Sequence, residues 1–108
     1  MPIGELTDRV TLRRRIDSAE SEGGIGTAYL AIGTVWARVR SLSARAMLAA
    51  DARTQEISHA VVLRRRSDLA PGDRLSWRGL VLTIRSMAPL DTDRAYIVCA
   101  CSELAVTG

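Results

Sequence analysis

The stretch L-S-W-R-G-L-V-L-T-I-R-S-M, residues 75–87, decides the fold class of this 108-residue chain. Two short runs rich in apolar residues meet at Arg78-Gly79, an arrangement typical of antiparallel strands joined by a tight turn. We therefore predict a β-hairpin over residues 75–78 and 80–87. A hairpin here favours an antiparallel β architecture for the surrounding chain.

The segments on either side of this hairpin predict two further strands. Pro71-Gly72-Asp73 is a strong turn signal, and an alternating run at residues 57–65 precedes it. Downstream, a turn over residues 89–93 leads into another alternating run at 95–103. The C-terminal half of the chain is thus predicted to contain four strands.

The N-terminal half predicts two longer strands separated by a loop. Residues 6–16 alternate, and residues 28–42 alternate again with a bend expected at Gly33. Between them, residues 17–27 are acidic and rich in glycine and serine, without periodicity, which indicates a long flexible loop. The candidate residues of this mobile loop are Asp17, Glu20, Glu22, Gly23, Gly24 and Gly26.

One helix completes the predicted architecture. Ser43 is a suitable N-cap, and residues 44–55 consist mostly of good helix formers. The chain, residues 1–108, has the size of a single domain. We predict a mainly β fold, a small antiparallel barrel or sandwich of about six strands. The α-helix lies between the second and third strands, and the long flexible loop between the first and second.

Composition restricts the possible classes of function but does not identify one of them. Apolar residues make up 47% of the chain but phenylalanine is absent, so partner subunits could supply part of the burial. All fifteen basic residues are arginine and the net charge is +3, too small to identify a nucleic-acid-binding protein by itself. The N-terminus lacks the apolar segment of a signal peptide, and no window approaches transmembrane length. We expect a soluble protein made in a reducing cytoplasm.

Two similar stretches each end in three arginines: V-T-L-R-R-R at residues 10–15 and V-V-L-R-R-R at residues 61–66. Strand alternation places Arg14 and Arg65 on the more apolar faces and the other four arginines on the opposite faces. If the two strands lie near each other, those four form a candidate subunit-interface or DNA-channel surface. The alternative is a solvated barrel face paired with acids. The four candidates are Arg13, Arg15, Arg64 and Arg66.

No residue pattern indicates catalysis, a metal or a cofactor. His59 with Cys99 or Cys101 could in principle form a base and nucleophile, but their spacing does not suggest it. Two thiols without further ligands do not make a zinc site, and both are expected to be plain core or interface residues. Gly23-Gly24-Ile25-Gly26 lacks the lysine and the strand-to-helix setting of a phosphate-binding loop.

The order of motifs along the chain resembles the phage head-tail joining family. The resemblance covers nearly the whole chain, from Gly4 to Glu103, and includes the head completion or stopper proteins of long-tailed phages and gene transfer agents. It rests on G-E-L-x-x-R-V-T-L near the N-terminus, T-V-W-A-R-V-R-S-L-S-A-R, H-A-V-V-L-R-R-R, P-G-D-R-L, G-L-V-L-T-I-R-S-M and a D-x-D-R turn before the last strand.

This resemblance implies a structural virion protein of the head-tail connector and no enzyme. Such a protein is a small β-barrel with a helix and a long loop, and it forms a ring of six or twelve copies around the channel through which DNA passes. Implied partners are the portal or adaptor ring on the head side, the tail terminator on the tail side, and double-stranded DNA contacted without sequence specificity.

The implied location is the virion, after synthesis in the host cytoplasm, and neither a cofactor nor a membrane is implied. Three alternatives remain open: a tail terminator, a minor tail component and a small nucleic-acid-binding β-barrel.

Overall fold

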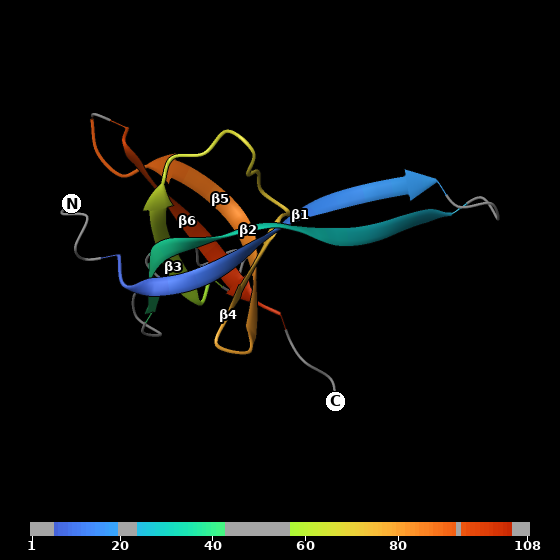
Figure 1. The fold of residues 1–108 in the computed structure, drawn as a ribbon, viewed down its shortest axis with the longest axis horizontal. Helices are drawn as coiled ribbons and strands as arrows, with labels where there is room; N and C mark the ends of the chain where they lie inside the picture. Colours follow the sequence, from blue (N-terminus) through green and yellow to red (C-terminus); the bar gives the residue numbers. More distant parts are fainter. Residues whose placement is uncertain (1–5, 20–23, 43–56, 93, 105–108) are drawn as a thin grey trace.

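The computed structural model describes residues 6–19, 24–42, 57–92 and 94–104. Six strands in these ranges pair antiparallel and form a closed barrel in the order β1-β2-β3-β6-β5-β4 (Figure 1). The predicted mainly β class and six-stranded antiparallel barrel are confirmed. The strands are β1 (Asp8–Ala19), β2 (Ile25–Ser41), β3 (His59–Arg64), β4 (Arg74–Trp77), β5 (Leu80–Pro89) and β6 (Tyr96–Glu103).

The hairpin expected at residues 75–87 is formed by β4 and β5, which pair from Trp77 opposite Leu80 onward. Arg78 and Gly79 join the two strands, with φ angles of 47° and 81°. Positive φ at both central residues is the property of a type I′ turn, whose twist matches that of the flanking strands. The local sequence therefore determines this part of the fold.

Replacing Gly79 with alanine is expected to destabilise the protein by about 1–2 kcal/mol, the cost of a left-handed conformation for an L-residue. A Cβ atom at Gly79 would meet nothing within 4 Å, so the cost is conformational and not steric. Urea unfolding measures the free energy change. Arg78→Asn is the matched control, because asparagine is preferred at the first position of this turn. An unchanged unfolding midpoint for Gly79→Ala would refute this interpretation of the turn.

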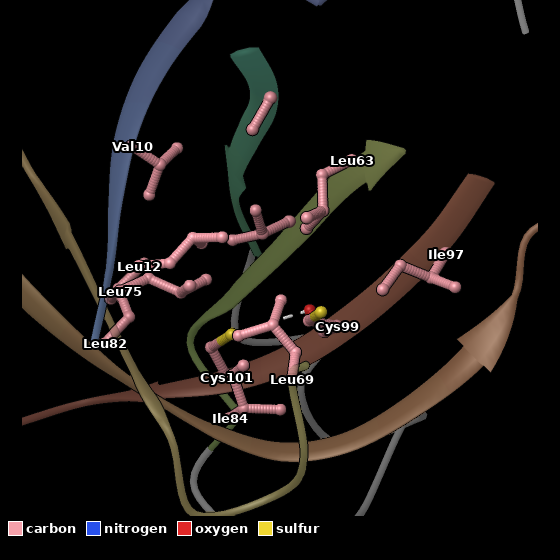
Figure 2. Close-up of a cluster of buried hydrophobic side chains, with 12 residues drawn as sticks. Val10, Leu12, Leu63, Leu69, Leu75, Leu82, Ile84, Ile97, Cys99 and Cys101 are labelled. Carbon is pink, nitrogen blue, oxygen red and sulfur yellow. Dashed lines mark hydrogen bonds between the residues drawn. The ribbon is translucent and has the colours of Figure 1, made fainter. Parts of the chain in front are cut away.

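One apolar cluster fills the interior of the barrel, and all six strands contribute to it (Figure 2). Leu69, from the segment between β3 and β4, also belongs to the cluster. Removing these side chains from water is the main favourable term in folding. The largest fully buried side chains are Leu12, Leu63, Leu75, Leu82, Ile84, Val10, Val61, Cys99 and Cys101.

A second, smaller cluster lies apart from the interior. Leu6 packs with Val62 of β3 and Tyr96 of β6, and Val98 adds a partly buried side chain. Val62 and Val98 are opposite each other in the register of β3 and β6, so the segment before β1 covers a face of these two strands. Both faces of β3 are consequently buried over part of its length.

The prediction of a flexible loop over residues 17–27 is wrong for those of its residues that the structure describes. β1 extends to Ala19 and β2 begins at Ile25, and the two strands remain paired up to these residues. A loop was predicted because apolar and polar residues do not alternate over residues 17–27. Alternation reports burial of one face against a core, and this part of the two strands lies beyond the core. Residues 20–23 lie outside the described residues.

The helix expected over residues 44–55 falls in the segment 43–56, which also lies outside the described residues. The ranges that the structure describes contain strands and turns and no helix. In this part of the chain there is accordingly no helix long and apolar enough to cross a membrane.

Candidate assembly interface

β1 and β2 continue beyond the barrel as a two-stranded ribbon, which we call the arm (residues 13–19 and 25–31; Figure 1). The register between the two strands shifts between Leu12 and Arg13, next to Gly33, where the sequence predicted a bend. An extra residue on one strand bends and twists a strand pair. The molecule measures 49 Å along its longest axis and 29 and 27 Å along the others.

The carboxylate of Asp73 fixes the base of the arm to the barrel. Asp73 is only 6% exposed, and its two oxygens accept hydrogen bonds from the backbone N–H groups of Arg15 and Ala70, both at 2.9 Å. The same turn pairs with β5, because the N–H of Gly72 donates to the carbonyl of Ile84 at 2.8 Å. This turn therefore joins the arm to the barrel wall.

One face of the arm satisfies its polar groups within the chain. Nε of Arg15 and Oγ1 of Thr27 both donate to Oδ1 of Asp17 at 3.0 Å. The hydrogen bond from Arg15, followed by that from Thr27, holds the pKa of the Asp17 carboxyl below its ordinary value. Nearer the barrel, the guanidinium of Arg74 stacks on the ring of Tyr29, with its central carbon 3.8 Å from the ring centroid.

The opposite face of the arm carries exposed apolar side chains. Ile16 and Leu30 are 40% and 55% exposed, and Ala28, the register partner of Ile16, is also exposed. Arg14 shares this face with them and is exposed, although alternation placed it on the apolar side of the strand. Alternation correctly groups Arg14 with the apolar side chains of the strand, but this part of the strand no longer packs against the core. Contiguous exposed apolar side chains are a common feature of interaction sites on proteins.

A groove opens where β2 and β3 separate. Their pairing ends at Ala37 opposite Leu63, after which β2 runs toward the arm and β3 ends at Arg64. The cavity has a volume of about 810 Å³, and we call it the Trp36 groove because this indole, 53% exposed, is its largest side chain. Its lining consists of Leu6, Thr7, Val35, Trp36 and residues 63–66.

One arginine stacks on the indole of the groove, and a second arginine, which lines the groove, lies over the ring of Tyr96. The guanidinium carbon of Arg9 lies 4.6 Å from the centroid of Trp36, and that of Arg64 lies 5.9 Å from the centroid of Tyr96. Such cation–π contacts stabilise by about 0.5–1 kcal/mol at exposed sites. Among the described residues, three arginines and no acidic residue line the groove. It is therefore an apolar cleft with a positively charged rim.

The two arginine runs are separated by β2. β1 and β3 pair with opposite edges of β2, with Arg13 opposite Ala31 and Leu63 opposite Ala37. Arg13 and Arg64 are consequently offset by about five residues along β2, roughly 17 Å at about 3.3 Å per residue. The structure does not bring the four candidate arginines together on one surface.

Each of the four candidates contacts its own chain. Besides Arg15 and Arg64, described above, Nε of Arg13 donates to Oγ of Ser76 at 3.0 Å. Arg66 donates to both carboxylate oxygens of Asp68 at 2.8 Å. These hydrogen bonds lower the pKa of Asp68, and the charge of Arg14 contributes to the same shift. Asp68, the partner of Arg66, lies in the segment between β3 and β4, where strand alternation places no side chain.

His59 occupies a structural position. It is 5% exposed, with its Nδ1 2.8 Å from Oγ of Ser58 and its Nε2 3.3 Å from Oγ of Ser41. Both ring nitrogens therefore have hydroxyl partners. Cys101 lies opposite His59 in the β-sheet, but its thiol donates to the carbonyl of Cys99 at 3.6 Å. Among the described residues, no three potential metal ligands come together.

Both cysteines are free and buried, as predicted, and their thiols are expected to resist alkylation in the folded protein. Burial raises the pKa of Cys99 and of Cys101 to about 12, so neither forms the reactive thiolate near pH 8. Timed labelling with a chromogenic disulfide reagent measures this protection. Both thiols should react promptly in 6–8 M urea, and prompt labelling without denaturant would show that the barrel interior is accessible.

The same shifts predict a dependence of stability on alkaline pH. The folded pKa of each thiol lies above its unfolded value of about 9, so burial of the neutral thiols stabilises the protein fully below pH 9. This contribution is lost as the pH rises from about 9 to 12. Urea unfolding at a series of pH values tests the direction, with a double Cys99→Ala, Cys101→Ala variant as the reference for other alkaline effects.

Two important residues were not singled out by sequence reasoning. Trp36 alternates with the buried residues of β2, so its outward position was a signal that a large apolar side chain lies on the surface. Asp73 was predicted only as a turn residue, because its partner Arg15 lies far away in the sequence. Nothing in the local pattern could indicate that contact.

Comparisons with known proteins concern almost the whole chain. A model of a family described as phage head completion protein matches residues 1–104. Protein SF1141 from Shigella flexneri 2a, known from a solution structure, is 25% identical, with a TM-score of 0.79 over 99% of this chain and 100% of its own. A chain of the virion of a native gene transfer agent particle is 22% identical and similar in fold, with a TM-score of 0.67 over 94% of this chain and 97% of its own. A search of curated proteins returns no match.

Proposed function

Because the chain belongs to the phage head completion protein family, we propose that it is a connector subunit of the head-tail junction, where six or twelve copies form a ring around the DNA channel. The observation that carries this proposal is the arm, which exposes Ile16 and Leu30 outside the barrel. Neighbours in a ring bind through two different surfaces of each subunit. The apolar face of the arm offers one such surface.

The ring has two protein neighbours in this proposal: a portal or adaptor ring on the head side and a tail terminator on the tail side. Membership of the family makes the chain a structural virion component, and the buried, fully bonded His59 is consistent with a role without catalysis. The interior of the barrel is filled by side chains, so the DNA channel of the proposal lies between subunits.

Contact with DNA in transit is proposed to be weak and independent of sequence. A net charge of +3 attracts a duplex only mildly, and the four candidate arginines are dispersed and engaged with their own chain. We propose that they serve subunit contacts or give the channel rim a mild positive field. The isolated protein should accordingly bind a duplex no more tightly than micromolar, with affinity that falls as salt rises.

Disruption of the gene in the phage or prophage that carries it tests the proposal. Without the connector subunit, particles should accumulate as separate heads and tails, and a plasmid copy of the gene should restore joined particles. Electron microscopy of negatively stained lysates measures the fraction that is joined. Normal joined particles in the disrupted strain would contradict the proposal, and intact heads with tails of abnormal length would favour a tail terminator.

A further inference from the structure

We propose that the Trp36 groove binds an extended, acidic segment of a different protein, which adds as a further strand to the open edge of β2. In this complex an apolar side chain of the segment contacts the indole of Trp36, and a carboxylate lies beside Arg65. The site belongs to the single barrel, so the inference does not depend on the proposed ring.

The edge of β2 is open beside the groove. β3 pairs with β2 from Ser41 to Ala37, whereas β1 pairs with the other edge of β2 from Ala37 to Ile25. Beyond Ala37, no described strand continues along the edge that β3 has left. An unpaired strand edge presents backbone donors and acceptors to which an extended peptide can bind.

The backbone groups of Thr34 point to this open edge. The N–H of Val39 donates to the Asp8 carboxylate on the β1 side at 2.8 Å, and the N–H of Leu42 donates to the carbonyl of Ser58 on the β3 side at 2.9 Å. Backbone groups of successive residues in a strand face opposite edges, and the register is regular over this stretch. The N–H and C=O of Thr34 therefore face the β3 side, where β3 has ended.

The groove lies in the position that a further strand would occupy. Val35 packs against the interior cluster and Trp36 points outward, and both residues line the groove together with Leu63 of β3. A cavity lined from both faces of a sheet lies between the strands and not on one face. Its volume of about 810 Å³ is within the range of pockets that hold ligands, about 300–1,000 Å³.

The charge of the groove calls for an acidic occupant. Arg65 is exposed and forms no hydrogen bond or ion pair through its side chain with any described residue. Arg64 is also exposed, with its guanidinium over the ring of Tyr96, and Arg66 is paired with Asp68. A carboxylate can bind a guanidinium through two parallel hydrogen bonds. Arg65 is therefore the first partner for a carboxylate of the bound segment.

The apolar lining favours a peptide over nucleic acid. The indole of Trp36 is 53% exposed, and Leu6, Val35 and Leu63 also line the groove. A sugar-phosphate backbone would satisfy the arginines but would place charged groups against these apolar residues. Tryptophan and arginine are the residues enriched at the energetic centres of protein–protein contacts. A segment that combines carboxylates with apolar side chains matches both parts of the lining.

Selection from a library of random peptides of about twelve residues tests the inference on the full chain. Peptides that bind should be enriched in aspartate or glutamate close to apolar residues at alternate positions, because side chains of an added strand alternate. Their affinity should fall as the salt concentration rises. If no peptide is enriched, or if the enriched peptides lack carboxylates, the inference is overturned.

Variants of the full chain then locate the bound peptide. Arg65→Glu and Trp36→Ala should each raise the Kd of the strongest enriched peptide about tenfold or more, through charge repulsion and loss of apolar contact. Both side chains are exposed, so these variants should fold. The matched controls are Arg40→Glu, at an exposed position of β2 outside the groove, and Leu90→Ala. Equal effects of the variants and their controls would place the peptide elsewhere and overturn the inference.

Amide hydrogen exchange by NMR tests the addition of a strand. The N–H of Thr34 should exchange about tenfold more slowly or less in the complex than in the free chain, because it gains a hydrogen-bond acceptor. The N–H of Gly79, in the turn between β4 and β5, serves as the control and should not change. A bound peptide that leaves exchange at Thr34 unaltered would contradict strand addition.

Two other occupants give different results. Slower exchange at Thr34 on raising the concentration of the chain without peptide would identify a second copy as the occupant. Binding of a DNA duplex that is weakened by Arg65→Glu, with no enriched peptide, would identify nucleic acid. Either result overturns the inference. None of these measurements decides whether the chain lies at the head-tail junction, which the gene disruption tests separately.

Discussion

Replacing Leu75 with alanine is expected to destabilise the folded barrel by about 2–5 kcal/mol. Leu75 is fully buried in the interior cluster and lies on β4, which has only four residues and closes the barrel by pairing with both β1 and β5. Truncation removes apolar contacts and leaves a cavity that rigid strands cannot close. A domain of this size is typically stable by about 5–15 kcal/mol, so the variant could lose a large part of its stability.

Urea unfolding followed by tryptophan fluorescence measures this change, with Leu90→Ala as the matched control. Leu90 is 38% exposed and lies after β5, so its truncation should change the free energy of unfolding by less than about 0.5 kcal/mol. Similar losses in the two variants would mean that the interior cluster is not the main source of stability.

Replacing Asp73 with alanine is expected to destabilise the protein by about 2–3 kcal/mol and to release the base of the arm. The carboxylate is buried and accepts hydrogen bonds from the N–H groups of Arg15 and Ala70. Alanine leaves both donors without that partner. Because Arg15 lies at the start of the arm, amide exchange at Arg15 should accelerate more than exchange at Leu82, in the middle of β5.

Asp73→Asn provides the matched comparison. Its amide keeps one oxygen acceptor and replaces the other by a donor, so about half of the loss is expected. Hydrogen exchange by NMR and urea unfolding give the two readouts. Equal stability of the alanine variant and the parent protein would show that the arm is held by its strand pairing alone.

The barrel was predictable because its strands carry local signals. The turn at Arg78-Gly79 and the turn ending at Asp73 are signalled by residues that adopt those conformations readily, and both were confirmed. Cys99 and Cys101, expected to be core or interface residues, lie in the interior. These predictions needed only the identities of neighbouring residues.

The arm was not predictable by the same reasoning. Its polar face and exposed apolar face pack on no core, so residues 17–19 and 25–27 lack the pattern by which strands are recognised. Their strand structure depends on pairing between β1 and β2, which begins inside the barrel and continues outward. A short stretch of sequence does not show whether it will pair with a segment far away in the chain.

The candidate site was predicted in part. Arg13, Arg15 and Arg64 lie on strands, whereas Arg66 follows the end of β3, and which of the four share a surface depends on the order of strands in the barrel. The Trp36 groove combines the segment before β1, the middle of β2 and the end of β3. Closure of the barrel brings together residues that are far apart in the sequence. No sequence motif predicts that these residues are close in space.

The most direct test of this account is electron cryo-microscopy of particles assembled with this chain. We expect a ring of six or twelve barrels at the head-tail junction, around the DNA, with direct contacts between neighbouring barrels. Density for the barrel at the far end of the tail, or barrels at the junction without contact between neighbouring copies, would contradict it.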